Sequence, residues 1–111
     1  MSRIFQKRGR DKLRVIAEIL EITKDGALKT QIMYRANLSF TQLNEYVRFM
    51  LKNELLLRVI SNDKAVYKAT VKGLDFLQRY GEIMELVRAE QNNAELAQVG
   101  HKKEFRREST K

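Results

Sequence analysis

The 111-residue sequence contains no cysteine, which excludes a disulfide framework and any metal site built on thiolates. It has a single histidine, His101, in a polar stretch, so a zinc finger is excluded and most metalloenzymes do not fit. No apolar run approaches the roughly 18 residues that a membrane-spanning helix needs. The N-terminus lacks the apolar segment of a signal peptide. We therefore expect a cytoplasmic protein with no metal, no other cofactor and no membrane partner.

Catalytic patterns are missing as well. The sequence has no glycine-rich phosphate loop, no Ser–His–Asp set beyond chance and no repeated pair of acids in an apolar setting. We expect neither an enzyme nor a site for a small-molecule ligand. The length and the hydrophobic fraction of 43% allow one domain with a modest core, together with tails.

The formal net charge of +8 is concentrated at the two ends of the chain. Residues 1–14 carry six basic side chains against one acidic, and residues 101–111 carry five against two. The other 86 residues carry 11 of each sign. Such an excess favours a polyanionic partner, with nucleic acid ahead of an anionic membrane. Neither end has the apolar stripe of an interfacial helix. The alternative is that the basic ends only increase solubility.

The spacing of apolar residues predicts three helices in the first half of the chain, at about residues 10–24, 29–36 and 40–52. Gly26 is expected to end the first helix in the left-handed conformation, and Asn37 to do the same after the second. The side chains expected to face the core are Leu13, Ile16, Ala17, Leu20, Ile32, Met33, Tyr34, Ala36, Phe40, Leu43, Val47 and Met50.

Ser39 and Gln42 have the spacing of a capping box at the start of the third helix. The opposite face of that helix is polar. Two helices joined by a tight turn, with the second one apolar on one side and hydrogen-bonding on the other, form a helix-turn-helix. That motif mainly presents side chains to the major groove of DNA.

Two short β-prone runs follow, at residues 55–60 and 65–70, and residues 61–64 between them have turn chemistry. A β-hairpin directly after a recognition-type helix makes a winged helix-turn-helix. The predicted fold class is therefore mainly α (α+β), with a long last helix that Thr70 caps.

The last helix, at about residues 71–98, carries side chains that alternate at spacings of three and four, as in a heptad seam. An apolar stripe beyond a small domain needs a partner, and a second copy of the chain is the simplest one. The residues predicted to form this dimer interface are Leu77, Tyr80, Met84, Val87, Gln91 and Ala94. The alternative is that the helix folds back on its own domain.

These elements predict four segments: a basic arm at residues 1–9, a winged domain at 10–76, a coiled-coil helix at 77–98 and a basic disordered tail at 99–111.

The string KTQIMYRANLS at residues 29–39, with Tyr46, Gly73 and Phe76-Leu77, carries a family resemblance. It resembles the small archaeal winged-helix DNA-binding proteins of the ten-kilodalton chromatin type from Sulfolobus. Members of that family are homodimers joined by an antiparallel coiled coil of their last helices. The resemblance thus implies that the seam is a dimer interface. One departure is at residues 53–54, where Asn-Glu follows the third helix and many winged helices have a glycine.

We expect double-stranded DNA as the partner of the polar face, the second helix and the wing. Gln42 and Asn44 have the chemistry to read adenine, Arg48 suits guanine or phosphate, and Glu45 would repel phosphate. The residues predicted to contact DNA are Lys29, Thr30, Gln31, Arg35, Ser39, Thr41, Gln42, Asn44, Arg48, Lys52, Arg58, Lys64 and Lys68, together with Arg8 and Arg10. The alternative for each is an ordinary solvated side chain.

The sequence therefore predicts a homodimeric DNA-binding protein, associated with the nucleoid, that acts in chromatin or in transcription regulation. The alternative is a winged-helix adaptor that binds proteins and not DNA.

Overall fold

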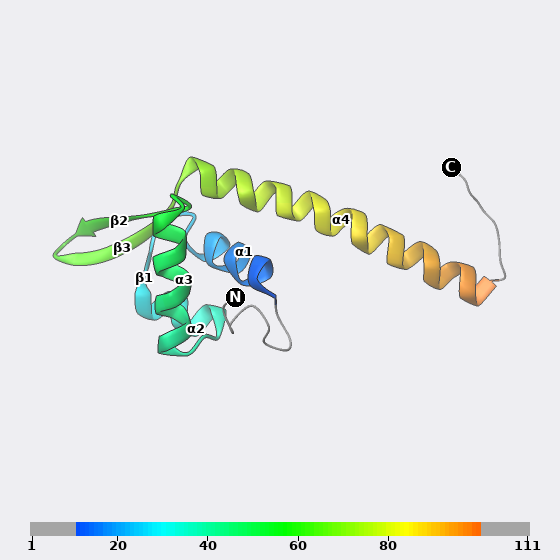
Figure 1. The fold of residues 1–111 in the computed structure, drawn as a ribbon, viewed down its shortest axis with the longest axis horizontal. Coiled ribbons are helices and arrows are strands. Elements are labelled where there is room, and N and C mark those ends of the chain that lie inside the picture. The colour runs from blue at the N-terminus through cyan, green and yellow to red at the C-terminus, as the bar shows by residue number, and fades with distance from the viewer. Residues whose placement is uncertain (1–10, 101–111) are drawn as a thin grey trace. The chain divides into compact units, whose positions relative to one another are not determined.

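The computed structural model describes residues 11–100, and the side chains up to residue 88. Three helices, α1 (Lys12–Ile22), α2 (Lys29–Ala36) and α3 (Phe40–Lys52), precede a β-hairpin, and a fourth, α4 (Val71–Gly100), follows it. The predicted winged helix is confirmed (Figure 1). The chain divides into two compact units, one ending at Tyr80 and the other beginning at Gly81. The arm at 1–9 and almost all of the predicted tail lie outside the described residues.

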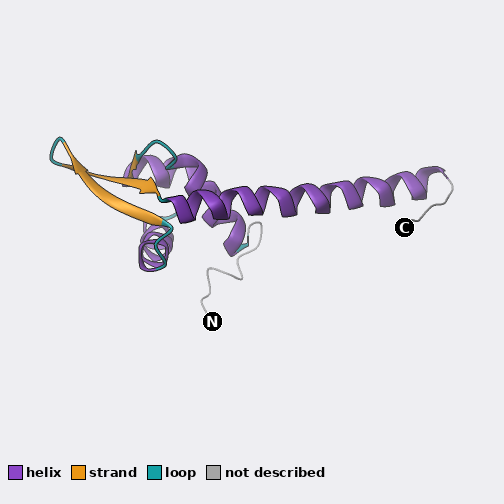
Figure 2. Cartoon of the chain, turned by 90° about the horizontal axis from the view of Figure 1, so that it is seen from above, coloured by secondary structure: helices purple, strands orange, loops and turns teal. Residues whose placement is uncertain are grey.

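The sheet has three strands in the order β1-β3-β2, all antiparallel. The wing consists of β2 (Leu56–Ser61) and β3 (Lys64–Ala69), which Figure 2 shows as the long hairpin. Asn62 and Asp63 at its tip both have positive φ angles, 52° and 63°, as the right-handed twist of a tight hairpin requires. The third strand, β1 (Ala27–Leu28), was not predicted from the sequence.

The core lies between the three short helices and the inner face of the sheet. Ile19, Leu20, Ile32 and Met50 are completely buried. Their partners include Leu43, Tyr46 and Val47 from α3 and Leu56, Tyr67 and Ala69 from the sheet.

Three side chains predicted to be in the core are exposed. Tyr34 is 77% exposed because α2 buries Ile32 and Ala36, and Tyr34 lies on the opposite side of the helix from both. Phe40, the first residue of α3, is 64% exposed, and the buried residues of that helix begin at Leu43. Leu13, in the first turn of α1, is 51% exposed, and the buried residues of that helix begin at Val15.

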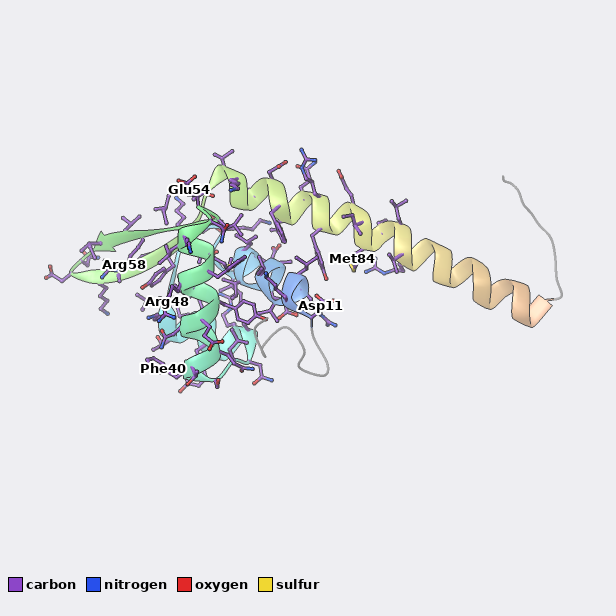
Figure 3. The ribbon with its side chains drawn as sticks, viewed as in Figure 1. Asp11, Phe40, Arg48, Glu54, Arg58 and Met84 are labelled. Carbon is purple, nitrogen blue, oxygen red and sulfur yellow. The ribbon has the colours of Figure 1, made fainter. Side chains whose placement is uncertain are left out.

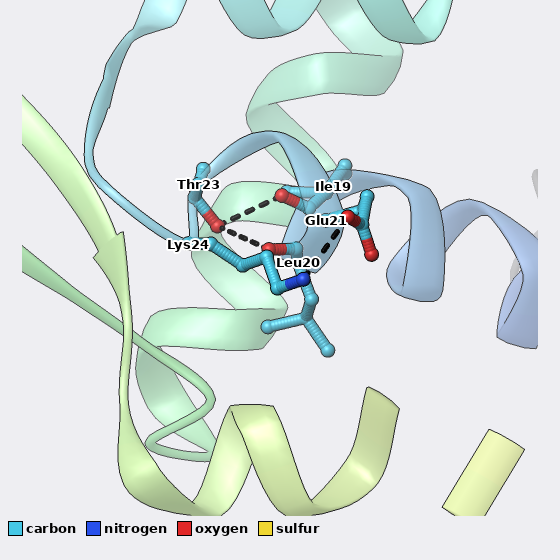
Figure 4. A network of polar contacts seen from close by, with 5 residues as sticks. All are labelled: Ile19, Leu20, Glu21, Thr23 and Lys24. Carbon is cyan, nitrogen blue, oxygen red and sulfur yellow. Dashed lines mark hydrogen bonds and ion pairs between the residues drawn. The ribbon is translucent and has the colours of Figure 1, made fainter. Parts of the chain in front are cut away.

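The first helix is shorter than predicted at both ends. It begins at Lys12, and not near residue 10, because Asp11 is its N-cap and accepts a hydrogen bond from the Arg14 N–H at 2.8 Å. It ends at Ile22. The buried Thr23 hydroxyl lies 2.8 Å from the Ile19 carbonyl and 3.3 Å from that of Leu20 (Figure 4).

Thr23 also connects α1 to the sheet. Its carbonyl accepts hydrogen bonds from the N–H groups of Gly26 and Ala69, each at 3.0 Å. Gly26 has a φ of 95°, as the sequence predicted for the turn after α1.

The end of α3 closes with the hydrogen bonds of a Schellman motif. The Leu55 N–H donates to the Met50 carbonyl at 2.8 Å, and the Glu54 N–H donates to that of Leu51 at 3.1 Å. Glu54 takes the left-handed conformation, with a φ of 62°, where a glycine is usual. The helix thus ends with the usual backbone conformation even though the glycine is missing, and Glu54 adopts that conformation despite its side chain.

Replacing Glu54 by glycine is expected to raise the free energy of unfolding by about 0.5–1 kcal/mol. The left-handed conformation costs a residue with a Cβ about 1–2 kcal/mol, and the greater freedom of glycine in the unfolded chain offsets part of the gain. Urea denaturation followed by circular dichroism measures the change. The matched control is Glu54→Ala, which removes the carboxylate but keeps Cβ and should bring no such gain. If both variants were stabilised equally, the gain would come from the loss of the carboxylate charge and not from relief of backbone strain.

Candidate nucleic-acid interface

The helix-turn-helix is held by two capping interactions. At the start of α3, the Ser39 hydroxyl accepts from the Gln42 N–H, and the Gln42 side-chain carbonyl accepts from the Ser39 N–H, both at 3.1 Å. This is the predicted capping box. At the start of α2, the Gln31 side-chain carbonyl accepts from the Leu28 N–H at 2.8 Å. Asn37 between the helices has the predicted left-handed conformation, with a φ of 57°.

Three of the residues predicted to contact DNA take part in these helix caps. Gln31, Ser39 and Gln42 each use an oxygen to hold a helix start. A bidentate contact of Gln42 with adenine needs that same side-chain carbonyl. Asn44 makes no such capping hydrogen bond, so of the two side-chain amides it is the better candidate for contacting a base.

The polar face of α3 presents Thr41, Arg48 and Lys52, which are exposed, with Asn44 half-buried beside them. Figure 3 shows Phe40 at one end of α3 and Arg48 nearer its middle. Glu45 differs from its neighbours. Its Oε1 is enclosed and has no hydrogen-bond partner among the residues that the structure describes. Glu45 is therefore half-buried, and not the solvated carboxylate that the helical pattern suggests.

The second helix contributes four predicted residues. Thr30, Gln31 and Arg35 are exposed, and Lys29, the first residue of the helix, is half-buried. Arg35 is in the last turn of α2, so Lys29 and Arg35 mark the two ends of the same helix.

The strand register separates the basic residues of the wing. Leu57 pairs with Lys68 and Ser61 with Lys64, whereas Arg58 pairs with the buried Tyr67. Because directly paired residues point to the same face of a sheet, Lys64 and Lys68 share the outer face and Arg58 lies on the other. Figure 3 shows Arg58 on the hairpin. All three side chains are exposed.

The basic side chains fall into two groups according to their partners. Outside residues 29–68, every described one has an interaction partner. Arg14, Lys24, Arg79 and Arg88 form ion pairs within their own helices, Lys12 lies over the Phe49 ring, and Lys72 donates to the Asn53 carbonyl. Between residues 29 and 68, no basic side chain has a partner among the described residues. These seven unpaired cations are Lys29, Arg35, Arg48, Lys52, Arg58, Lys64 and Lys68.

All seven unpaired cations were predicted from the sequence to contact DNA, and all of them lie on α2, α3 or the wing. The remaining two predicted cations, Arg8 and Arg10, lie outside the described residues.

The first two residues of the predicted dimer seam contact their own domain. Leu77 packs against its core, and Tyr80 stacks on Phe76 with ring centroids 6.5 Å apart. Partial burial, followed by the negative charge of Asp11, raises the pKa of the Tyr80 phenol, so Tyr80 lies near the start of α1.

Further along α4, Met84 is half-buried and Val87 is 45% exposed. The side chains of Gln91 and Ala94 are not described. The structure adds two exposed apolar residues that the heptad pattern missed, Ile83 at 55% and Leu86 at 71%. With Val87 they have the spacing i, i+3, i+4, which forms one stripe on a helix. Within residues 11–100, no helix has both the length and the apolar character needed to cross a bilayer.

The family profile described as "Winged helix-turn-helix" matches residues 9–88, which include all the elements described so far up to the first half of α4. The chain is a winged helix-turn-helix protein. An uncharacterised protein of Methanocaldococcus jannaschii, MJ0290, is 38% identical over 79 residues, which cover 70% of this chain but 36% of that protein. The chain thus matches little more than a third of this relative.

Two solved structures share the winged fold of this chain. Sso10a-2, a DNA-binding protein from Sulfolobus solfataricus, aligns with a TM-score of 0.68 at 17% identity, covering 85% of this chain and 100% of its own. The MepR–DNA complex from S. aureus aligns with a TM-score of 0.58 at 13% identity, covering 78% of this chain and 72% of its own. The resemblance noted in the sequence is confirmed at the level of family and fold. The family assignment also agrees with the expectation that the chain is not an enzyme.

Proposed function

We propose that this winged helix-turn-helix chain binds double-stranded DNA. The observation that carries the proposal is that seven cations on the helix-turn-helix and wing have no partner among the described residues, whereas the other described cations all have partners. Pairing inside the protein would neutralise these charges, whereas unpaired cations are available for phosphate. Two proteins of similar fold, Sso10a-2 and MepR, are described as a DNA-binding protein and as a DNA complex.

In the proposed complex, α3 lies in the major groove with Thr41, Asn44 and Arg48 toward the bases. The N-terminal end of α2 faces a phosphate through its free N–H groups and Lys29. The wing holds the flanking backbone with Lys64 and Lys68 on one face and Arg58 on the other. The basic arm, including Arg8 and Arg10, adds attraction that does not depend on sequence.

We further propose that the chain acts as a homodimer through the second half of α4. The exposed stripe of Ile83, Leu86 and Val87 supports this, because a second copy would remove it from water. Leu77 and Tyr80 already contact their own domain. The proposed dimer interface therefore begins at Met84 and continues through Gln91 and Ala94. A dimer of this kind fits a nucleoid-associated role, in chromatin or in transcription regulation.

A gel-shift titration with random-sequence duplex DNA tests the proposal. We expect a shifted complex at micromolar protein, since phosphate contacts alone give nonspecific affinities in that range. The matched variants are Arg48→Gln, which removes an unpaired cation and should weaken the shift, and Arg79→Gln, which removes a cation paired with Asp75 and should not. Footprinting on genomic DNA then separates a regulator, with a discrete protected site, from an architectural protein with uniform coverage.

An adaptor that binds a protein partner is the second candidate. The wing favours it, because Leu57, Val59 and Ile60 are 41%, 41% and 58% exposed on a strand that pairs on one side only. An unshifted duplex at micromolar protein would support the adaptor and contradict DNA binding.

A further inference from the structure

The two exposed aromatic side chains in the part of the chain that the structure describes are both at the helix-turn-helix. Among the described side chains, Tyr46 and Tyr67 are buried, and Phe49, Phe76 and Tyr80 are half-buried. Only Tyr34 and Phe40 are exposed, at 77% and 64%. Neither contributes to the core, so their presence is not explained by folding.

Phe40 is the first residue of α3. In helix-turn-helix proteins, the N-terminal residues of the second helix contact base edges in the major groove. Asn44 lies one turn further along the same side of the helix, since residues four apart are neighbours on its surface. An exposed phenyl ring and a free carboxamide therefore occupy the leading edge of the helix together. The ring has no hydrogen-bonding group and can read only an apolar feature of a base.

The major-groove edge of thymine carries such a feature, its 5-methyl group. The other natural bases present only hydrogen-bond donors and acceptors there. We propose that Phe40 contacts the 5-methyl group of thymine, so that this chain prefers sites with thymine under the start of α3. Asn44 beside it suits the adenine of an A·T pair. The inference rests on the proposed DNA binding and adds the chemical group that is read.

Tyr34 serves as the control. It lies on α2, and the first helix of a helix-turn-helix crosses the DNA backbone. Its hydroxyl suits a phosphate oxygen, which is the same in every sequence. Loss of Tyr34 should weaken binding to all duplexes alike, whereas loss of Phe40 should remove a preference.

The experiment compares two duplexes of identical sequence, one with thymine and one with deoxyuridine at every thymine position. Base pairing and phosphate charge are the same in both, and only the 5-methyl groups differ. The full chain is expected to bind the thymine duplex about fourfold more tightly for each methyl group that Phe40 covers, from the free energy of burying a CH₂-sized group. Fluorescence anisotropy gives both dissociation constants.

Phe40→Ala should bind the two duplexes equally, and Phe40→Leu, which keeps an apolar side chain, should retain part of the preference. Tyr34→Ala should bind both more weakly with an unchanged ratio. Circular dichroism checks that the variants fold, and neither Phe40 nor Tyr34 belongs to the buried core. Equal affinity of the unmodified chain for the two duplexes would overturn the inference while leaving DNA binding intact. A preference that survives Phe40→Ala would overturn the assignment to Phe40. Failure to bind either duplex would overturn the proposed function itself.

Discussion

Binding of this chain to random duplex DNA is expected to weaken about a thousandfold when the salt concentration rises from about 50 to about 200 mM. The described winged domain carries seven unpaired cations. If about six of them neutralise phosphates, the logarithm of the association constant falls with that of the salt concentration at a slope near −5. Anisotropy titrations at several salt concentrations measure the slope.

Single substitutions measure how much each residue contributes to that slope. Replacing Arg48 or Lys68 by glutamine should make the slope shallower by about 0.9, since one counterion fewer is released. Arg79→Gln is the matched control. Arg79 forms an exposed ion pair with Asp75 at 2.9 Å, so its removal should leave the slope unchanged. An affinity that hardly responds to salt would argue against phosphate contacts and in favour of a protein partner.

Replacing Gly73 by alanine is expected to lower the free energy of unfolding by about 2–3 kcal/mol. A Cβ at this position would lie 2.3 Å from the Leu55 carbonyl oxygen and 2.7 Å from Leu20 Cδ2. The Leu55 carbonyl cannot retreat freely, because it accepts the Thr70 N–H at 3.0 Å. For a domain of this size, such a loss corresponds to a fall in melting temperature of roughly 10 °C or more.

Gly81 provides the matched control on the same helix. A Cβ there would meet nothing within 4 Å. Gly81→Ala should therefore stabilise α4 by up to about 1 kcal/mol, the difference in helix propensity between the two residues. Thermal and urea denaturation of both variants measure the contrast. If Gly81→Ala lowered the stability, another surface would have to lie against Gly81. If Gly73→Ala left the stability unchanged, α4 would have to be able to move away from Leu55.

The parts of the fold that follow local rules could be predicted from the sequence. The capping box of Ser39 and Gln42, the left-handed Asn37 and the turn between the wing strands each depend on a few neighbouring residues. Strand β1 could not be predicted in this way. Its two residues count as a strand only because Ala27 and Leu28 pair with Tyr67 and Val66, far along the chain.

The candidate site was predictable to a similar degree. The residue types on the polar face of α3 and on the wing could be read from the sequence, because helix and strand periodicity assign faces. The ion pairs of Arg14, Lys24, Arg79 and Arg88 join residues three or four apart on one helix, and that spacing can be read from the sequence. Arg48 also has an acid three residues before it, Glu45. That the two form no ion pair could not be read, because the enclosure of the Glu45 carboxylate depends on tertiary packing. The exposure of Phe40 depended in the same way on where the core ends.

The start of α4 is fastened directly to the end of α3. The Thr70 hydroxyl donates to the Glu54 carbonyl at 2.6 Å, Lys72 donates to that of Asn53 at 2.9 Å, and Gly73 lies against Leu55. The wing lies between these segments in the sequence, yet hydrogen bonds join them directly. A rotation of the first turn of α4 would therefore also move the end of α3, without passing through the wing.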